Sequence, residues 1–424
     1  MYIIPLPTKK KNTSKLLINK LIIMPVSTRS RSKTKKKRKR INNNSSLNNT
    51  NTPIKVALPK SKKSKNKKNT KKKKKNSKGR MKKAAVKAIV GNGSSSSSSS
   101  ISDRGQLLFD LGRDLISATM ICRPSKRNRS PYVADITLNE DGNRTAIAHV
   151  PNLDMGGKCV KSTEMLLTAA RDRKGNLVGA NTLGKYGTPK CEFHAKLIKV
   201  KEAENSTLND GNGVFVGAHP SLGEKIAKSL LEKNLIKELP PIVDISTQVS
   251  NICNCDMRTD FVVTHEDGTR NVIEVKQVVD TDYNSETPPP NREKCVFFEK
   301  EKPYIRSGIF PWGNSKQKGP DGEKVVSARA IKHVRELTKI ARGTVKDNEG
   351  KKLNATILFI NNREDALQFR PNSDACPSFA RYLKEAKDGG VNILCRRVIW
   401  GNDGDDIGKA FDGGNVDVKF FSSC

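Results

Sequence analysis

Short runs of alternating apolar and polar residues fill the chain from about Leu107 to Val200, a pattern typical of half-buried β-strands. The segments "YVADITL" (Tyr132–Leu138) and "RTAIAHV" (Arg144–Val150) flank "NEDGN", whose Asp-Gly pair favours a β-hairpin. A further strand is predicted over "EFHAKLIKV" (Glu192–Val200). Several short strands separated by turn residues predict a small barrel or a sandwich.

The apolar period changes from two to about 3.6 residues after the polar linker "NSTLNDGNG". Leu222, Ile226 and Leu230 share one face of a predicted helix that ends before Pro240. The elements predicted after it are two strands in "TDFVVTH" and "NVIEVKQVV", a helix in "SARAIKHVRELTKIA", a strand in "ATILFINN", a helix in "CPSFARYLKEAKDGG" and a final strand in "VNILCRRVIW". The order α-β-β-α-β-α-β predicts a mixed α/β domain. A Pro-rich segment at about 280–324 is predicted as a loop insertion.

The charge of the chain is concentrated at its start. Residues 1–102 hold 31 Lys and Arg and no Asp or Glu, which leaves 49 basic against 43 acidic residues in the remainder. A segment with few aromatic residues and high net charge cannot bury enough apolar surface to fold, so it is predicted to be a disordered basic tail. We therefore expect three parts: the tail (1–102), a β domain (103–204) and an α/β domain (205–424).

Several functions are compatible with the tail. It has the composition of a solvated leader, of a nuclear-import signal and of an anchor for the phosphate backbone of nucleic acid. Its lysine blocks favour the nucleus, although an organelle transit peptide has a similar composition. Nine scattered cysteines, an odd number, indicate free thiols rather than a secreted protein. No apolar run is long enough to span a membrane, so no membrane partner is expected.

The strand "NVIEVKQVV" (Asn271–Val279) carries two ionisable residues, Glu274 and Lys276, among apolar ones. They share a face because side chains alternate along a strand. If Asp267-Gly268 form a two-residue turn, Asp260 on the preceding strand lies within one residue of facing Glu274. Three ionisable groups therefore converge on one face of the hairpin.

Two adjacent carboxylates repel each other unless a cation lies between them. Oxygen ligands of this kind suit Mg²⁺ or Mn²⁺, and a nearby lysine can orient an attacking water or stabilise the charge of a phosphorane. The pattern indicates metal-dependent phosphodiester chemistry at Asp260, Glu274 and Lys276. A structural ion pair between Lys276 and one of the carboxylates is the alternative explanation.

The chain also resembles the sugar fermentation stimulation protein family from about Leu115 to Val398. The ordered segments that carry the resemblance are "RPSKRNRSPYVADITL", "AHVPNLDMGG", "VFVGAHPSLGEKIAKSLL", "TDFVV", "VIEVKQV", "GIFP", "VSARAIKHVREL" and "FRPNSDACPSFARYLKEAKDGGVNILCRRV". The resemblance implies an N-terminal oligonucleotide-binding-like (OB-like) β-barrel and a C-terminal PD-(D/E)xK nuclease-like α/β domain. It also implies nucleic-acid binding, to DNA rather than to RNA.

Matched to the family's motif, Asp260 and Glu274 would be metal ligands and Lys276 would position the nucleophile. Three residues match the family's basic helix and would lie near phosphate: Arg329, Lys332 and His333. An ordinary solvated helix face would carry the same residues. In the β domain, the basic segment "RPSKRNRS" supplies Arg123, Lys126 and Arg127 as further candidate contacts to nucleic acid. His149 matches a family position and is interpreted as a turn histidine, with contact to nucleic acid as the alternative.

Two departures from the family pattern affect the site. His219-Pro220 and Gly223-Glu224 replace residues that are usually Asn-Thr and Pro-Asn. Nuclease-like folds of this class often add an acidic residue from the first core helix, a role open to Glu224, although a capping box with Ser221 is the preferred interpretation. "PWGNSKQKGPDGEK" also interrupts a region near the expected site.

Two functions follow from these patterns. The first is a nucleic-acid-binding protein with a Mg²⁺-dependent nuclease site. The second is a non-catalytic DNA-binding regulatory protein that keeps the nuclease-like fold. Because sequence choice requires contacts to base edges that no motif supplies, the specificity stays open, as does the oligomeric state.

Overall fold

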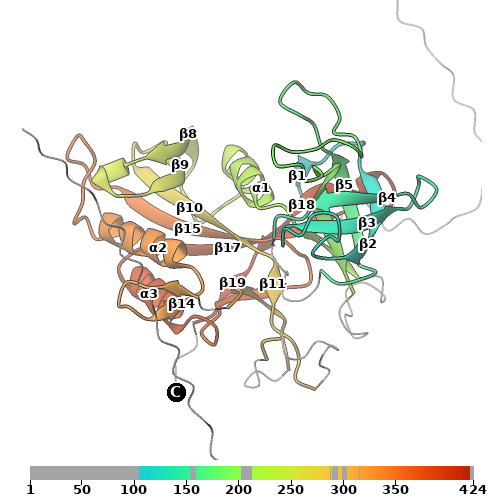
Figure 1. Cartoon of the computed structure of the whole chain (residues 1–424). Helices are drawn as coiled ribbons and strands as arrows, with labels where there is room; N and C mark the ends of the chain where they lie inside the picture. The colour runs from blue at the N-terminus through green and yellow to red at the C-terminus, as the bar shows by residue number, and fades with distance from the viewer. Residues whose placement is uncertain are drawn as a thin grey trace, which may run out of the picture. The chain divides into compact units, whose positions relative to one another are not determined.

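The computed structural model describes residues 105–152, 159–201, 213–286, 288, 295–297, 303–314 and 316–420. The predicted basic tail lies outside these residues. Within them the chain forms a closed β-barrel and an α/β part, which is a mixed α+β architecture (Figure 1).

Five strands form the barrel: β2 (Ile116–Cys122), β3 (Val133–Leu138), β4 (Thr145–His149), β5 (Glu164–Ala169) and β6 (Phe193–Val200). Antiparallel pairs link neighbouring strands, and a parallel pairing of β4 with β6 closes the ring. The predicted hairpin is confirmed as β3–β4, where Ile136 faces Ala146. Both side chains are fully buried in the barrel core, as the alternation of apolar residues predicts.

A seven-stranded sheet forms the centre of the α/β part. Its order is β1 (Leu107–Asp110), β18 (Lys409–Asn415), β17 (Asn392–Trp400), β15 (Asn354–Asn361), β10 (Arg270–Val278), β9 (Arg258–His265) and β8 (Ile242–Ser250). The three central strands β10, β15 and β17 are parallel, and β9 is antiparallel to both of its neighbours, β8 and β10.

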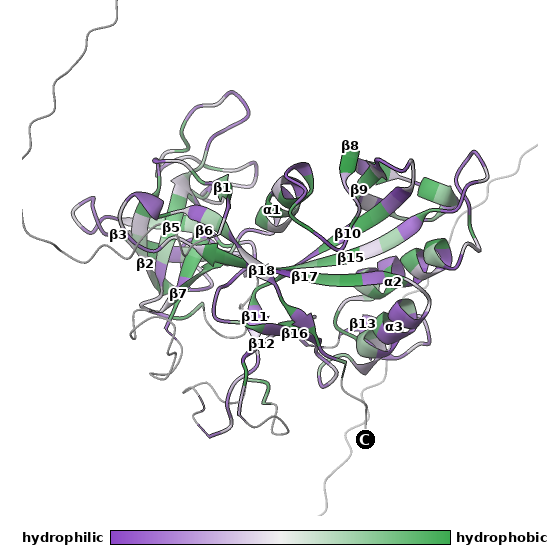
Figure 2. Cartoon of the chain, turned by 180° about the vertical axis from the view of Figure 1, so that it is seen from behind, coloured by the Kyte–Doolittle hydropathy of each residue, from purple (hydrophilic) through white to green (hydrophobic). Residues whose placement is uncertain are grey.

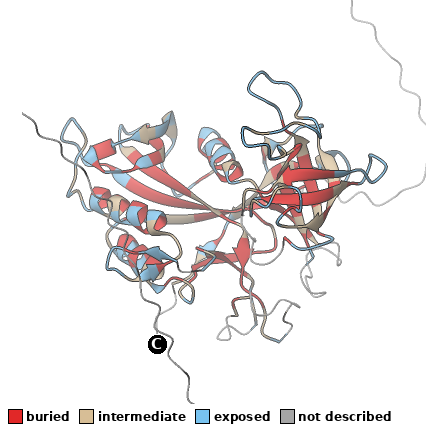
Figure 3. Ribbon diagram, viewed as in Figure 1, coloured by how far each residue is buried: buried red, intermediate tan, exposed pale blue. Residues whose placement is uncertain are grey.

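Three helices cover the two faces of this sheet. Helix α1 (Ser221–Glu232) packs on the face that carries Ile273 and Val275 of β10. Helices α2 (Ala328–Ala341) and α3 (Pro377–Asp388) pack on the opposite face. Figure 3 shows the central strands buried between helices whose outer faces are exposed, and Figure 2 shows the same strands as largely hydrophobic. In the described part of the chain, no helix has the length and apolar character needed to cross a membrane.

Several predicted boundaries differ from the structure. Strand β7 (Val214–Gly217) lies beyond the predicted division after residue 204, yet it pairs with β6 of the barrel sheet. Strand β1 lies before that division and pairs with β18 of the α/β sheet. The strand β17 is not the last one, because β18 and β19 (Asp417–Val418) follow it. The edge strand β8 was not predicted at all, because most of its residues are exposed and follow no regular alternation.

The segment 280–324 is also more structured than the predicted loop. Its strands are β11 (Asp280–Thr281), β12 (Ser307–Phe310), β13 (Gln317–Lys318) and β14 (Lys324–Val325). β11 and β12 form a second sheet with β16 (Gln368–Pro371) and β19. These strands are of two to four residues, too short for a periodic pattern to reveal them.

Candidate functional site

The β9–β10 hairpin places the two predicted carboxylates opposite each other. Thr264 faces Arg270 and Phe261 faces Ile273, and the same register puts Asp260 directly opposite Glu274. The predicted two-residue turn is wrong by one position. Gly268 has a positive φ of 77° and ends a three-residue turn that is closed by a hydrogen bond from the backbone N–H of His265 to the carbonyl of Thr269.

Strand β8 adds one side chain, Gln248, to the opposed pair Asp260 and Glu274. We call these side chains, together with Glu224 and Lys276, the acidic row. The register of β8 with β9 pairs Thr247 with Phe261 and Val249 with Thr259, which places Gln248 opposite Asp260. Nε2 of Gln248 donates to Oδ1 of Asp260 at 3.3 Å. Gln248 has a positive φ of 54°, an unfavourable backbone conformation for a residue with a side chain. The strained residue therefore lies within the row.

Glu224 joins the row from helix α1, and the predicted capping box is wrong. Pro220 already has helical angles, so the helix begins one residue too early for Ser221 to be its N-cap. The Ser221 hydroxyl instead contacts Nδ1 of His219 at 2.7 Å. Oε2 of Glu224 accepts a hydrogen bond from Nε2 of Gln248 at 3.0 Å, so Gln248 bridges Glu224 and Asp260.

Glu274 is the most buried member of the row, with 4% of its surface exposed. Its Oε1 contacts the Lys276 ammonium and Nδ1 of His333, the latter at 2.5 Å. Burial opposes the charge of Glu274, but the His333 hydrogen bond and the charge of Lys276 outweigh it and hold its pKa below the usual value. Its Oε2 is buried and has no hydrogen-bond partner in the described residues.

Asp260 behaves in the opposite way. Its Oδ2 accepts a hydrogen bond from the backbone N–H of Val275 at 2.8 Å. Burial, together with the neighbouring Glu274 carboxylate, raises the pKa of Asp260 to about 6. The negative charge of the two opposed carboxylates is therefore not fully neutralised, because Lys276 interacts mainly with Glu274.

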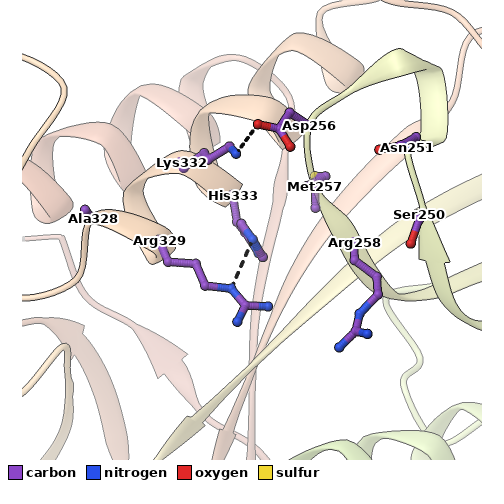
Figure 4. A pocket seen from close by; sticks show the side chains of 9 residues that line it. All are labelled: Ser250, Asn251, Asp256, Met257, Arg258, Ala328, Arg329, Lys332 and His333. Carbon is purple, nitrogen blue, oxygen red and sulfur yellow. Dashed lines mark hydrogen bonds and ion pairs between the residues drawn. The ribbon is translucent and has the colours of Figure 1, made fainter. Parts of the chain in front are cut away.

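A pocket of about 530 Å³ lies beside the row, between helix α2 and the start of β9 (Figure 4). Arg329, Lys332 and His333 line it from α2, and Arg258 lines it from β9. Nε of Arg329 lies 3.5 Å from Nε2 of His333. Because the arginine can only donate, Nε2 of His333 accepts and its Nδ1 carries the hydrogen that it donates to Glu274. Lys332 forms an ion pair with Asp256.

His333 was predicted as a phosphate contact with Arg329 and Lys332, but it lies at a different depth. It is 4% exposed and bonded to Glu274, whereas the other two side chains are exposed. Helix α2 therefore presents the charged side chains of Arg329 and Lys332 to the pocket, and its His333 forms a hydrogen bond with Glu274.

The three candidate residues in the barrel do not lie in this row. The guanidinium of Arg123 donates to the carbonyls of Pro131 and Asn152 at 2.8 and 2.9 Å, so it holds its own loop together. The side chains of Lys126 and Arg127 are exposed, and Nε of Arg127 lies 3.6 Å from the Asp135 carboxylate.

The described residues contain no group of three or more His, Cys, Asp or Glu side chains placed to hold a metal ion. Mg²⁺ needs fewer protein ligands, because it usually keeps several waters and is bound through one or two carboxylates. Asp260 and Glu274 supply two carboxylates, and Oε2 of Glu274 is a buried acceptor without a donor among the described residues. The residues present therefore fit a small divalent cation with oxygen ligands.

Gln248 and Gln277 are the members of this region that the sequence did not reveal. The side chain of Gln277 donates to the carbonyl of Gly217 at 2.6 Å and accepts from the N–H of Gly223 at 3.1 Å, which ties α1 to β10. Neither residue type has a spacing that distinguishes it from a surface glutamine. Only the position of Gln277, next to Lys276, was a signal that could have been used.

Comparison with known proteins places the chain among one group of relatives. Residues 320–404 match the family model described as "Sugar fermentation stimulation protein RE domain". A sugar fermentation stimulation protein homolog of Trichodesmium erythraeum is 26% identical over 236 residues, which cover 55% of this chain and 77% of that protein. A homolog of Acaryochloris marina is 24% identical over 288 residues, covering 67% and 88%.

Among solved structures, SfsA of Pyrococcus furiosus in complex with Ca²⁺ is 18% identical, with a TM-score of 0.48, and covers 74% of this chain and 99% of that one. The fold and the site define a two-part protein, in which a closed five-stranded β-barrel precedes an α/β part that carries a row of acidic side chains. These matches support the assignment of the chain to the sugar fermentation stimulation protein family, as the resemblance found in the sequence implies.

Proposed function

We propose that the chain binds nucleic acid, DNA rather than RNA, and hydrolyses its phosphodiester bonds with the help of Mg²⁺ or Mn²⁺. The observation that carries the proposal is the opposed pair Asp260 and Glu274, in which no donor from the described part of the chain reaches the buried Oε2 of Glu274. The order of α1, the antiparallel strands β8–β9–β10, α2 and the parallel strand β15 fits a PD-(D/E)xK nuclease-like core.

Each residue of the row has a role in this proposal. Asp260 and Glu274 hold the cation, which when bound would polarise the phosphoryl oxygen and lower the pKa of a water. Lys276 lies on the same face and orients the attacking water. His333 donates to Glu274 and fixes the direction of its carboxylate, which makes it a positioning residue.

The surroundings of the row support a phosphate-bearing substrate. Arg258, Arg329 and Lys332 line the adjacent pocket, and Asp256 is the only acidic residue among its lining side chains. Arginine binds phosphate oxygens through two parallel hydrogen bonds, so these side chains can position the backbone of a strand next to Glu274. Glu224 reaches the row only through Gln248, and we assign it a supporting role.

Cleavage of end-labelled DNA and RNA by the purified full chain tests this function. We expect cleavage with Mg²⁺ or Mn²⁺, none with a chelator, and a loss of at least about 100-fold in rate for Glu274→Gln. Glu266→Gln is the matched control, because Glu266 is an exposed carboxylate on the turn of the same hairpin. Equal rates for the wild type and Glu274→Gln would exclude the enzymatic assignment.

The second candidate is a regulatory protein that binds nucleic acid without cutting it. The contact between Lys276 and Glu274 favours it, because an ammonium already partly neutralises the carboxylate without a metal. This candidate predicts that no divalent ion supports cleavage and that Asp260→Ala binds DNA as tightly as the wild type. The basic tail would add a salt-dependent contact to the phosphate backbone in either case, and its lysine blocks lead us to propose a nuclear location.

A further inference from the structure

Three aromatic or imidazole rings lie together on the outer surface of the barrel. The rings of Tyr132 and His149 have centroids 6.4 Å apart, and those of His149 and His194 are 5.7 Å apart in an edge-to-face arrangement. His149 of β4 and His194 of β6 are register partners across the parallel pairing that closes the barrel. Tyr132 is 41% exposed, so the group presents a ring to solvent.

Basic side chains border these rings. Lys196 lies two residues after His194 and shares its outward face of β6. Burial, and after it the charge of Lys225 on α1, lowers the pKa of Lys196, and burial with the charge of Lys196 lowers the pKa of His219, which follows β7. Neither lysine forms an ion pair with a carboxylate of the described residues. We call the six residues Tyr132, His149, His194, Lys196, His219 and Lys225 the ring patch.

The imidazoles of the ring patch are uncharged near neutral pH. Burial lowers the pKa of His149 and of His194, and the nearby Arg123 and Lys196, respectively, lower them further. Burial and Lys196 lower the pKa of His219 to about 4. Neutral imidazoles offer flat faces and edges rather than charge, and the lysines beside them supply the charge.

The ring patch is connected to the acidic row through helix α1. His219 directly precedes the helix and Glu224 lies in its first turn, so five positions of chain separate the two groups. Gln277 fixes this turn by bonding Gly217 on one side and Gly223 on the other. A strand lying on the ring patch can therefore continue along the start of α1 towards Asp260 and Glu274.

We propose that the ring patch binds unpaired bases, so that the substrate of the acidic row is single-stranded nucleic acid. Bases in a duplex are stacked on each other and cannot reach side-chain rings, whereas unpaired bases stack on Tyr and His faces. Lys196 and Lys225 contact the phosphates between the stacked bases. This inference rests on the proposed function for the reaction, but the binding step that it describes requires no metal.

The test compares two 12-nucleotide probes with the same number of phosphates, an oligothymidine and an abasic strand, bound to the full chain in a chelator. The basic tail contacts phosphates of both probes, so its contribution cancels in the ratio of their affinities. Stacking predicts that oligothymidine binds about tenfold more tightly than the abasic strand.

Tyr132→Leu, which removes the ring at an exposed position, should reduce that ratio about fivefold or more. Tyr186→Leu is the matched control, because Tyr186 is 85% exposed and lies outside the ring patch. The proposal is overturned if the wild type binds both probes equally or if the two variants have the same ratio. If the chain prefers oligothymidine to the abasic strand but never cleaves nucleic acid, the ring-patch proposal stands and the nuclease proposal fails. If it cleaves but binds both probes equally, the nuclease proposal stands and the ring-patch proposal fails.

Discussion

Two groups of buried charges, one on the β9–β10 hairpin and one beyond the end of β10, are balanced in opposite ways. Beyond the end of the strand, Asp365 accepts hydrogen bonds from Nε and Nη2 of Arg363, both at 2.6 Å, and from Arg306 at 3.0 Å. These arginines hold the pKa of Asp365 well below its usual range despite its burial. In the acidic row the pKa of Asp260 is raised instead, and one oxygen of Glu274 has no partner among the described residues.

The difference separates a structural role from a chemical one. A buried carboxylate with two arginines has both oxygens hydrogen-bonded and its charge neutralised, so it has little tendency to bind a cation. A buried carboxylate pair with a single lysine has a free acceptor and excess negative charge, a state that costs stability and that a bound cation would relieve. We therefore interpret the first group as part of the scaffold and the second as the site.

The largest effect is expected from Asp365→Asn. The substitution leaves the fully buried guanidinium of Arg363 without its carboxylate and should cost about 3–5 kcal/mol of unfolding free energy. Chemical denaturation measures the loss. Asp321→Asn is the control, because its ion pair with Arg381 is about half exposed and solvent-screened pairs of this kind contribute little to stability. A similar loss for both variants would contradict the comparison.

The acidic row should respond in the opposite direction. Asp260→Asn removes one of two opposed charges and keeps an oxygen that can accept from the N–H of Val275. We expect the free energy of unfolding without divalent ions to rise by about 1–2 kcal/mol while cleavage is lost. Glu266→Gln, on the exposed turn, should change neither quantity. If Asp260→Asn is destabilised instead, the row is a structural ion pair and not a site with excess charge.

A smaller effect is expected at His219, where the disfavoured charge is positive. Its folded-state pKa of about 4 lies below the usual value of about 6.5, so between these values the unfolded chain binds a proton that the folded chain does not. Stability from this group is present above pH 6.5 and is lost as the pH falls towards 4. From pH 7.5 to 5, the wild type should lose about 1–2 °C more of its thermal midpoint than His219→Asn. Equal losses would show that His219 is freely solvated.

The hairpin that holds the site could be predicted from the sequence, and the reason is geometric. Side chains alternate along strands, so the short turn between Asp260 and Glu274 limits their relative position to one residue either way. The predicted register is wrong by one residue because Gly268, in a left-handed conformation, lengthens the turn from two residues to three. A sequence cannot distinguish the two turns when Asp-Gly occurs in both.

Other parts of the site were beyond the reach of a single sequence. Glu224 was assigned to a capping box because Ser221 precedes it by three residues, but the helical angles of Pro220 move the helix start. Gln248 lies on an edge strand with few buried residues, where no apolar period reveals either the strand or its register. Such contacts are decided by the pairing of β8 with β9, which is a tertiary event.

The pairing of β1 with β18 has a consequence for the synthesis of the chain. Leu107 faces Phe411, about 300 residues later, so the first described strand has its partner almost at the opposite end of the described chain. On the ribosome the barrel strands β2 to β7 can pair as they emerge, but β1 must wait until nearly all of the protein has been made. A gene cut between the barrel and the α/β part would leave β18 with an unpaired edge, which promotes aggregation. We therefore expect the two parts to be recovered in soluble form only when they are made as one chain.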